Sequence, residues 1–174
     1  MVIAVIADTH LPRGGRRLPD ACVERIGAAD LLLHAGDFST LEVLRELEAI
    51  GPPLLAVHGN VDSADLLRLL PAERVVEAEG ARIAMVHDAG ARAGRLERMR
   101  RRFDGRADIV VFGHSHQPLH EQAPDGFQIF NPGSTTERRR APAHTMGLIH
   151  VEAGLATCEL VLLIPYPASC RRES

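Results

Sequence analysis

The chain has 174 residues, of which 45% are hydrophobic and 25% charged, and its formal net charge at pH 7 is −3. This composition is typical of a globular protein with a buried core, and no excess of positive charge favours a nucleic acid duplex or a membrane surface. The three cysteines are widely spaced and form no CxxC pair, which argues against a disulfide framework or structural zinc site and suits a reducing compartment.

The N-terminal apolar run is too short for a signal segment and has no basic residues before it. No segment reaches the roughly 18 apolar residues of a membrane span. We therefore expect a cytoplasmic protein that makes no use of a membrane. A single domain over residues 1–174 is expected, with a loosely ordered tail over 165–174. The sequence leaves the oligomeric state open, including a homo-oligomer.

The first half of the chain alternates short apolar runs with amphipathic segments. The pattern predicts strands over 2–7, 30–35 and 53–59, and helices over 19–28, 39–50 and 63–70. Ser39 or Thr40 is the expected N-cap of the second helix. This β-α-β-α-β order predicts parallel strands joined by right-handed crossovers.

The second half of the chain has a different pattern. It predicts a β-hairpin over 74–87 with its turn near Glu79 and Gly80, a helix over 92–103, and strands over 108–113, 127–131, 145–154 and 156–163. The last three strands are expected to be antiparallel neighbours joined by glycine-containing turns. The whole chain is thus predicted to be one α/β domain with a mixed pair of sheets.

Residues that can bind metal follow most of the predicted strands. They are Asp8 and His10 after the first strand, Asp37 after the second, Asn60 after the third, His87 after the hairpin, and His114 and His116 after the strand over 108–113. In an open α/β sheet, the loops at the carboxyl ends of the strands gather at one crevice. We expect these side chains to meet there, with Gly36, Gly59 and Gly113 allowing sharp turns of the backbone.

The number and type of these side chains limit the site they can form. Two carboxylates, one amide oxygen and four imidazoles are too many for one tetrahedral ion, but they make two sets of four if one carboxylate bridges. Oxygen and nitrogen donors without thiolate favour manganese, iron or zinc over calcium or copper. Such a site attracts phosphate and lowers the pKa of bound water. His114 and His116, two apart in an extended segment, would share a face and serve neighbouring ions.

The ordered blocks D-x-H, G-D, G-N-x-D, H and G-H-x-H resemble the calcineurin-like metallophosphoesterase superfamily. The N-P-G-S segment at 131–134 is similar to the small bacterial and archaeal phosphodiesterase branch, and the resemblance covers residues 1 to about 163. It implies two facing mixed β-sheets flanked by helices, a four-layer α/β/β/α sandwich. It also implies one metal ion held by Asp8, His10, Asp37 and His116, and a second held by Asp37, Asn60, His87 and His114.

The resemblance implies a two-metal phosphodiesterase that hydrolyses small phosphodiesters through a hydroxide bridging the metals. Mn²⁺ is the expected metal, with Fe²⁺ or Zn²⁺ as alternatives. Asp37, Asn60, His10 and His114 are the expected catalytic residues, of which His10 and His114 stabilise charge on the phosphoryl oxygens together with the metals.

Two positions depart from the family pattern. Many larger members have a histidine near the leaving group where this chain has Val61, so the group that protonates the leaving oxygen is not identified. A glycine often follows the histidine of the fourth block, whereas Asp88 follows it here. This extra carboxylate would tune the second metal or narrow the pocket.

Several polar residues are open to two interpretations. His34 and His58 either orient a ligand or simply close a strand end. Asp62 either hydrogen-bonds His10 or another ligand, or is an acid at the start of the helix over 63–70, where Ser63 or Asp62 is the cap. One arginine within 138–140 either reaches a substrate phosphate or lies in an exposed loop. The arginine-rich segment 98–103 is predicted to be a solvated helix face.

Two other functions fit the same fold. A non-catalytic scaffold that binds a partner protein is the main alternative, although relatives of that kind lose metal ligands and all seven are present here. A nuclease is the other. Larger DNA-cutting members add a capping domain for which 174 residues leave no room, and the net charge of −3 gives no basic surface for a duplex.

Overall fold

The structure is a computed structural model that describes residues 1–163, so the tail predicted over 165–174 lies outside the described residues. Among the helices of the described chain, none is long and apolar enough to cross a membrane. The strands form two separate sheets of five, and the elements of the first half of the chain lie mostly in one of them.

The first sheet has the strand order β10-β9-β1-β2-β3. Its strands are β1 (Val2–Ile6), β2 (Leu31–His34), β3 (Leu54–Ala56), β9 (His144–Glu152) and β10 (Leu155–Leu163). The first three pair in parallel, as the β-α-β-α-β order predicts, while β9 runs antiparallel to both β1 and β10. This arrangement points the carboxyl ends of β1, β2 and β3 in one direction.

Three helices connect and follow the parallel strands of the first sheet: α1 (Asp20–Gly27), α2 (Leu41–Glu48) and α3 (Ala64–Leu69). Thr40 occupies the N-cap position of α2, but its side chain makes no capping hydrogen bond to the helix. Ser63 does cap α3, because its hydroxyl accepts a hydrogen bond from the Leu66 amide. The prediction that α2 begins after Ser39 or Thr40 is therefore confirmed. The structure shows no side-chain capping hydrogen bond at this position.

The second sheet has the strand order β4-β5-β6-β8-β7. Its strands are β4 (Glu73–Ala78), β5 (Ala81–Val86), β6 (Ile109–Val111), β7 (Leu119–Gln122) and β8 (Gln128–Asn131), and its helix is α4 (Arg95–Arg102). The predicted hairpin is confirmed, since β4 and β5 pair antiparallel on either side of Glu79 and Gly80. The strands β5, β6 and β8 pair in parallel, which makes the sheet mixed.

The predicted succession of antiparallel strands at the end of the chain is wrong in one respect. The strand β8 pairs in parallel with β6 and antiparallel with β7, and β9 belongs to the other sheet. Only β9 and β10 form the expected hairpin. The strand β7 was not predicted, because its sequence Leu119–Gln122 is an edge strand with a single apolar residue and no periodic signal.

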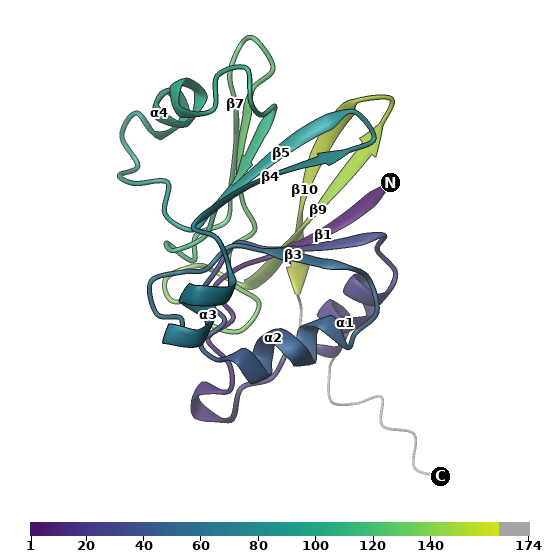
Figure 1. The fold of residues 1–174 in the computed structure, drawn as a ribbon, viewed down its shortest axis with the longest axis vertical. Helices are drawn as coiled ribbons and strands as arrows, with labels where there is room; N and C mark the ends of the chain where they lie inside the picture. Colours follow the sequence, from purple (N-terminus) through teal and green to yellow (C-terminus); the bar gives the residue numbers. More distant parts are fainter. Residues whose placement is uncertain (164–174) are drawn as a thin grey trace.

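The two sheets face each other and carry helices on their outer sides (Figure 1). The core between the sheets contains Ile3, Val5, Ile83, Val111 and Phe130. A second core lies between the first sheet and its helices, and a third core contains α4 residues together with residues of the second sheet. The four-layer α/β/β/α sandwich predicted from the sequence is confirmed.

The two ends of this sandwich differ. At one end the β4–β5 and β9–β10 turns meet, since a Cβ atom built on Gly80 would lie 3.4 Å from the Gly154 Cα. The Met1 ammonium group joins them by an ion pair of 3.0 Å with the Glu79 carboxylate and a hydrogen bond to the Val151 carbonyl. At the opposite end lie the carboxyl ends of β1, β2, β3, β5 and β6.

Candidate metal centre

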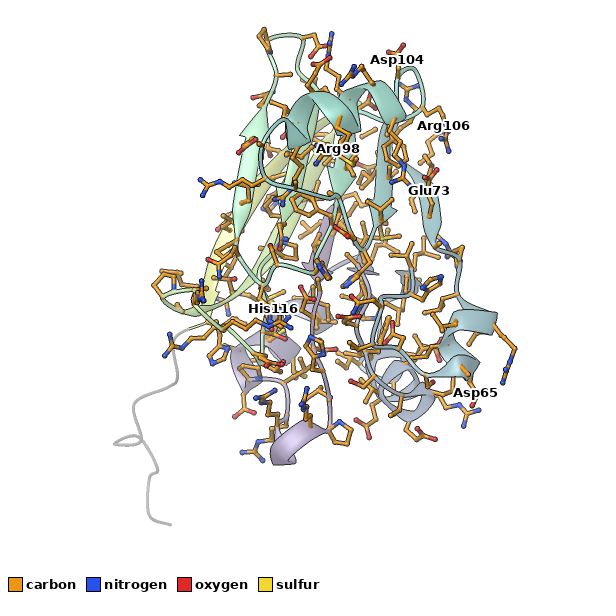
Figure 2. The ribbon with its side chains drawn as sticks, turned by 90° about the vertical axis from the view of Figure 1, so that its left-hand side faces the viewer. Asp65, Glu73, Arg98, Asp104, Arg106 and His116 are labelled. Carbon is orange, nitrogen blue, oxygen red and sulfur yellow. The ribbon has the colours of Figure 1, made fainter. Side chains whose placement is uncertain are left out.

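The seven predicted ligand residues converge at the loop end of the sandwich. Asp8, His10, Asp37, His87 and His116 are buried, whereas Asn60 and His114 are exposed. Figure 2 shows His116 among the loops where the two sheets meet. The arginine-rich helix α4 lies on the outer side of the second sheet, and Figure 2 labels Arg98 on it and Asp104 and Arg106 after it, apart from His116.

One group of donor atoms surrounds the two buried imidazoles of His10 and His116. The His10 Nε2 atom lies 3.1 Å from His116 Nε2 and 3.6 Å from Asp37 Oδ2, and His116 Nε2 lies 3.5 Å from Asp8 Oδ1. Ligand atoms that share a divalent ion at bonds of about 2.1 Å are separated by about 3.0 to 3.4 Å. These four side chains therefore have the spacing of one metal site.

A second group of donor atoms continues from the same carboxylate. The His87 Nε2 atom lies 3.2 Å from Asp37 Oδ2 and 3.1 Å from Asn60 Oδ1, and His114 Nδ1 lies 2.9 Å from Asn60 Oδ1. The Asp37 Oδ2 atom thus faces both groups, while its Oδ1 atom accepts a hydrogen bond from the Val61 amide. Asp37 occupies the position expected of a bridging carboxylate.

The backbone contacts of two imidazoles leave their other ring nitrogens as acceptors. The His87 Nδ1–H donates to the Ala35 carbonyl at 2.8 Å, and the His116 Nδ1–H donates to the Glu137 carbonyl. Each Nε2 atom of a neutral ring therefore presents its lone pair to the cluster. Asp8 Oδ2 is buried and has no hydrogen-bond partner. Such crowded electron pairs are stabilised by cations, so the donor set fits divalent metal ions.

The pKa values of the acidic groups reflect the same crowding. Burial, with the nearby Asp37 charge adding to it, raises the pKa of Asp8 to about 7. Burial also acts on Asp37, but the hydrogen bond and charge of His87 outweigh it and hold the pKa of Asp37 at about 2. The pKa of His87 is raised in spite of burial, because Asp37 stabilises its charged form. Without metal, protons supply part of the missing positive charge.

Five of the seven ligand residues have a left-handed backbone. The φ angles are 54° at Asp8, 45° at His10, 64° at Asp37, 68° at His114 and 57° at His116. This conformation is uncommon outside glycine and concentrates at functional sites. The prediction that His114 and His116 share a face of an extended segment is therefore wrong. Both residues leave the extended region, and the loop curls so that His114 turns toward Asn60 while His116 lies near Asp8.

The three glycines beside the ligands matter mainly because a side chain at these positions would collide with a neighbouring loop. Only Gly36 has a positive φ, of 91°. A Cβ atom on Gly59 would lie 2.0 Å from Asp37 Oδ1, and one on Gly113 would lie 2.9 Å from the Ala7 Cβ and 3.0 Å from Asp8 Oδ2. The predicted role of sharp turning holds at Gly36 alone. At Gly59 and Gly113 a side chain would collide with a neighbouring loop.

Asp62 links the loops that follow β2 and β3. Its carboxylate accepts hydrogen bonds from the backbone amides of Gly59 at 2.7 Å, Ser39 at 2.8 Å and Asp37 at 3.1 Å. It makes no hydrogen bond to His10. Of the two interpretations open for Asp62, the structure favours the one in which it bonds a ligand residue, but it does so through the backbone amide of Asp37 and not through an imidazole.

His34 lies fully buried between the first two ligand loops. Its Nδ1 atom accepts a hydrogen bond from the Gly36 amide at 3.1 Å, so its Nε2–H faces the Thr9 hydroxyl, also at 3.1 Å. Burial lowers the pKa of His34 well below its usual value and keeps the ring neutral. Of the two interpretations open for His34, the structure favours the one in which it orients ligands. Its ring bonds Gly36, which precedes Asp37, and Thr9, which lies between Asp8 and His10.

The N-P-G-S segment holds the remaining loops, a role that the sequence did not reveal. The Asn131 amide donates to the Gly113 carbonyl at 2.9 Å, and its oxygen accepts from the Gly133 amide at 2.8 Å. The Ser134 hydroxyl donates to the Asp8 carbonyl at 2.7 Å. Both side chains are buried. In the sequence this segment indicated only the branch of the family, and nothing in it pointed to these two hydrogen-bonding roles.

The remaining candidate residues lie outside the ligand cluster. Asp88 is exposed, and its carboxylate accepts a hydrogen bond from the Gly90 amide at 2.7 Å. The Asp88 carboxylate, which was expected to tune the second metal or narrow the pocket, thus uses one of its oxygens to hold the turn at Gly90. His58 contacts only the neighbouring Gly59 carbonyl, at 3.3 Å, through its side chain. It therefore orients no ligand side chain directly.

Three comparisons relate the chain to known proteins. The family model of the calcineurin-like phosphoesterase superfamily domain matches residues 1–154. A probable metallophosphoesterase of Methanothermobacter thermautotrophicus is 33% identical over 149 residues, which cover 85% of each chain. A phosphodiesterase of Methanocaldococcus jannaschii is 27% identical over 146 residues, covering 76% of this chain and 83% of the relative.

Among solved structures, a Vps29 protein of Entamoeba histolytica in complex with zinc has a similar fold. Its TM-score is 0.74 at 22% identity, and the match covers 94% of this chain and 100% of the other. At this level of identity the likeness concerns the fold alone.

Proposed function

The chain belongs to the calcineurin-like phosphoesterase superfamily, and on this basis we propose that it is a two-metal phosphodiesterase acting on small phosphodiesters. The observation that carries the proposal is the cluster of seven donor side chains, in which Asp37 Oδ2 lies 3.6 Å from His10 Nε2 and 3.2 Å from His87 Nε2. Asp8 Oδ2 of this cluster is buried without a hydrogen-bond partner, and a divalent cation would satisfy it.

Each proposed metal ion has four protein ligands. The first set is Asp8, His10, Asp37 and His116, and the second is Asp37, Asn60, His87 and His114. Two bound ions would supply an activated water and positive charge for the phosphoryl oxygens. Oxygen and nitrogen donors without thiolate suit Mn²⁺, with Fe²⁺ and Zn²⁺ as alternatives.

The two sets differ in how open they are to substrate. The first set consists of buried side chains, while Asn60 and His114 of the second set are exposed. We therefore propose that the phosphodiester approaches from the side of Asn60 and His114. On that side His114 stabilises charge that develops on a phosphoryl oxygen, as does His10 from the inner side.

Val61 bears on the class of leaving group. Its side chain is 47% exposed beside Asn60, and its amide is bonded to Asp37 Oδ1. An apolar side chain cannot protonate a leaving oxygen. We therefore expect good turnover of esters whose leaving group needs no proton, such as aryl esters, and slower turnover of simple alkyl esters.

A scaffold that binds a partner protein remains the second candidate. The fold likeness to Vps29 is compatible with this function but carries no information about activity. The complete ligand set favours the enzyme, because a scaffold has no need of a buried carboxylate oxygen without a hydrogen-bond partner, such as Asp8 Oδ2.

The test combines metal content with hydrolysis of an aryl phosphodiester. The purified protein should bind two Mn²⁺ ions and hydrolyse the ester, and Asp37→Asn should lose both properties. Asp65→Asn is the matched control, since this exposed carboxylate pairs only with Arg68 at 2.6 Å on α3. Absence of bound metal and of turnover in the wild type, or wild-type behaviour of Asp37→Asn, would reject the proposal.

A further inference from the structure

Arg139 lies on a turn that is attached to the metal centre. The Glu137 amide before it donates to the Ser134 hydroxyl at 2.9 Å, and the Glu137 carbonyl accepts from His116 Nδ1. The turn closes through a hydrogen bond of 2.7 Å from the Ala141 amide to the Arg138 carbonyl. Arg139 itself has a left-handed backbone, with a φ of 47°. Its position relative to the ligands is therefore fixed by the segment that holds them.

The guanidinium group of Arg139 has no carboxylate partner among the described residues, and it lies against the carbonyl of a candidate ligand residue, His114. Within residues 1–163, no carboxylate oxygen lies within 4.0 Å of it, whereas Arg16, Arg82, Arg100 and Arg106 each form such an ion pair. Its one described contact is from Nη1 to the His114 carbonyl, at 3.5 Å. Arg139 is thus an exposed cation at the edge of the site with most of its donors unused.

The charge of Arg139 lies close to the ligand loops. Its Nη1 atom is 3.5 Å from the His114 carbonyl, and its turn bonds His116 Nδ1 through the Glu137 carbonyl. A cation so placed repels metal ions in the same cluster. Two divalent ions against the carboxylates of Asp8 and Asp37 already leave the site positive. The arrangement becomes favourable when an anion lies between the guanidinium and the metals.

We propose that Arg139 binds an anionic oxygen of the substrate phosphoryl group, opposite the metal ions. A guanidinium presents parallel N–H donors that match two oxygens of a phosphate, which neither the imidazoles nor an ammonium group can do. This inference rests on the proposed function, since it assumes a phosphate ester at the metals. It makes Arg139 a specificity residue for the phosphoryl group, and it selects one arginine of the three at 138–140.

The proposal predicts opposite effects of one substitution on two kinds of binding. In Arg139→Ala, inorganic phosphate should bind the Mn²⁺-loaded protein about 10- to 100-fold more weakly, because charge-assisted hydrogen bonds are lost. Without phosphate, Mn²⁺ should bind the same variant several-fold more tightly, because a repelling charge is gone. Both constants can be measured by isothermal titration calorimetry, independently of turnover.

Arg140→Ala and Arg139→Lys are the matched variants. Arg140 is an exposed neighbour of equal charge with no described hydrogen bond to a ligand residue, so its removal should change both affinities less than about twofold. Arg139→Lys keeps the charge and loses the paired donors. Compared with the wild type, Arg139→Lys should therefore keep the same Mn²⁺ affinity but bind phosphate more weakly, at a level between the wild type and Arg139→Ala.

The outcomes separate this inference from the proposed function. Unchanged phosphate affinity in Arg139→Ala, or an equal loss in Arg140→Ala, would overturn the role of Arg139 even if the wild type hydrolyses phosphodiesters. Arg139-dependent phosphate binding in a wild type that turns over no ester would support the role and reject the enzyme. A raised KM for an aryl phosphodiester in Arg139→Ala, with Mn²⁺ affinity increased, would support both.

Discussion

The two ends of the sandwich use the same unusual backbone conformation in different ways. At the hairpin end, Glu79 and Ala153 have positive φ angles of 45° and 50°, and each is followed by a glycine of positive φ. Two successive positive φ angles are required by the tight type I′ turn that joins antiparallel strands. Both side chains are exposed. At this end the conformation serves the turn, and the identity of the side chain matters little.

At the metal end the conformation serves the side chains. Asp8, His10, Asp37, His114 and His116 have left-handed backbones, and no type I′ turn requires this of them. The cost is offset by hydrogen bonds from neighbouring loops, such as those of Asp62, Ser134 and His34. The difference shows that a left-handed residue marks a functional site only when the local turn does not explain it.

The largest contrast is expected between Ala substitutions at Gly59 and Gly80. In Gly59→Ala the new methyl group would lie 2.0 Å from Asp37 Oδ1, so Mn²⁺ affinity and activity should fall at least about 100-fold. In Gly80→Ala the nearest atom is 3.4 Å away but φ is 86°, so unfolding should become easier by about 1 to 2 kcal/mol without loss of metal. Metal titration and urea denaturation of both variants measure this. Equal metal affinities would contradict it.

Metal binding should stabilise the protein through one end only. At a Mn²⁺ concentration of about 100 times its Kd, the gain is about 2.7 kcal/mol, or a rise in Tm of about 5 to 10 °C. Asp37→Asn should abolish this rise, whereas Glu79→Ala at the hairpin end should keep it. Thermal unfolding with Mn²⁺ or with a chelator is the measurement. A rise that survives in Asp37→Asn would place the stabilising ion elsewhere.

The third prediction compares two carboxylates that accept backbone hydrogen bonds. Asp62→Ala removes the acceptor of three amides at the metal end and should cost about 2 kcal/mol of unfolding free energy, with about a 10-fold loss of Mn²⁺ affinity. Asp30→Ala removes the acceptor of the Val2 amide at the hairpin end and should cost about 0.5 to 1 kcal/mol with no change in metal affinity. A smaller loss in Asp62→Ala than in Asp30→Ala would refute the role given to Asp62.

The smallest effect is a gain at the hairpin end. Ala153→Asn places the preferred asparagine before Gly154 in the β9–β10 turn and should stabilise the fold by about 0.5 kcal/mol, because asparagine tolerates positive φ. Mn²⁺ affinity should not change. Chemical denaturation checks the gain, and Ala153→Val, whose branched side chain resists this conformation, should show a loss instead.

The sequence predicted those parts of the molecule whose signals are local. The parallel β1–β2–β3 order follows from short apolar runs between amphipathic helices, and the four-layer arrangement follows from the family resemblance. The seven candidate ligands could be predicted because each follows a strand and carries a metal-binding group, and the structure brings them together. Asp8 and His10 illustrate this, since they directly follow the longest apolar run of the first half.

The parts that were missed depend on contacts distant in sequence. Pairing of β8 with β6 is decided by tertiary packing, and no residue of β8 signals it. Asn131 and Ser134 act on loops 18 and 126 residues away, so their roles are visible only in three dimensions. The extended geometry assumed for His114 and His116 failed because strand periodicity stops where the strand β6 ends at Val111.

The close approach at Gly36, Gly59 and Gly113 also limits how this protein can evolve. At Gly36 and Gly59 even a methyl group would lie under 3.0 Å from a ligand loop, and at Gly113 it would be nearly as close. We expect substitutions in this interior to disrupt the ligand loops before they can alter the chemistry. Changes in substrate preference are therefore expected at exposed positions at the edge, of which Val61 and Arg139 are examples. Directed evolution toward a new ester should begin there.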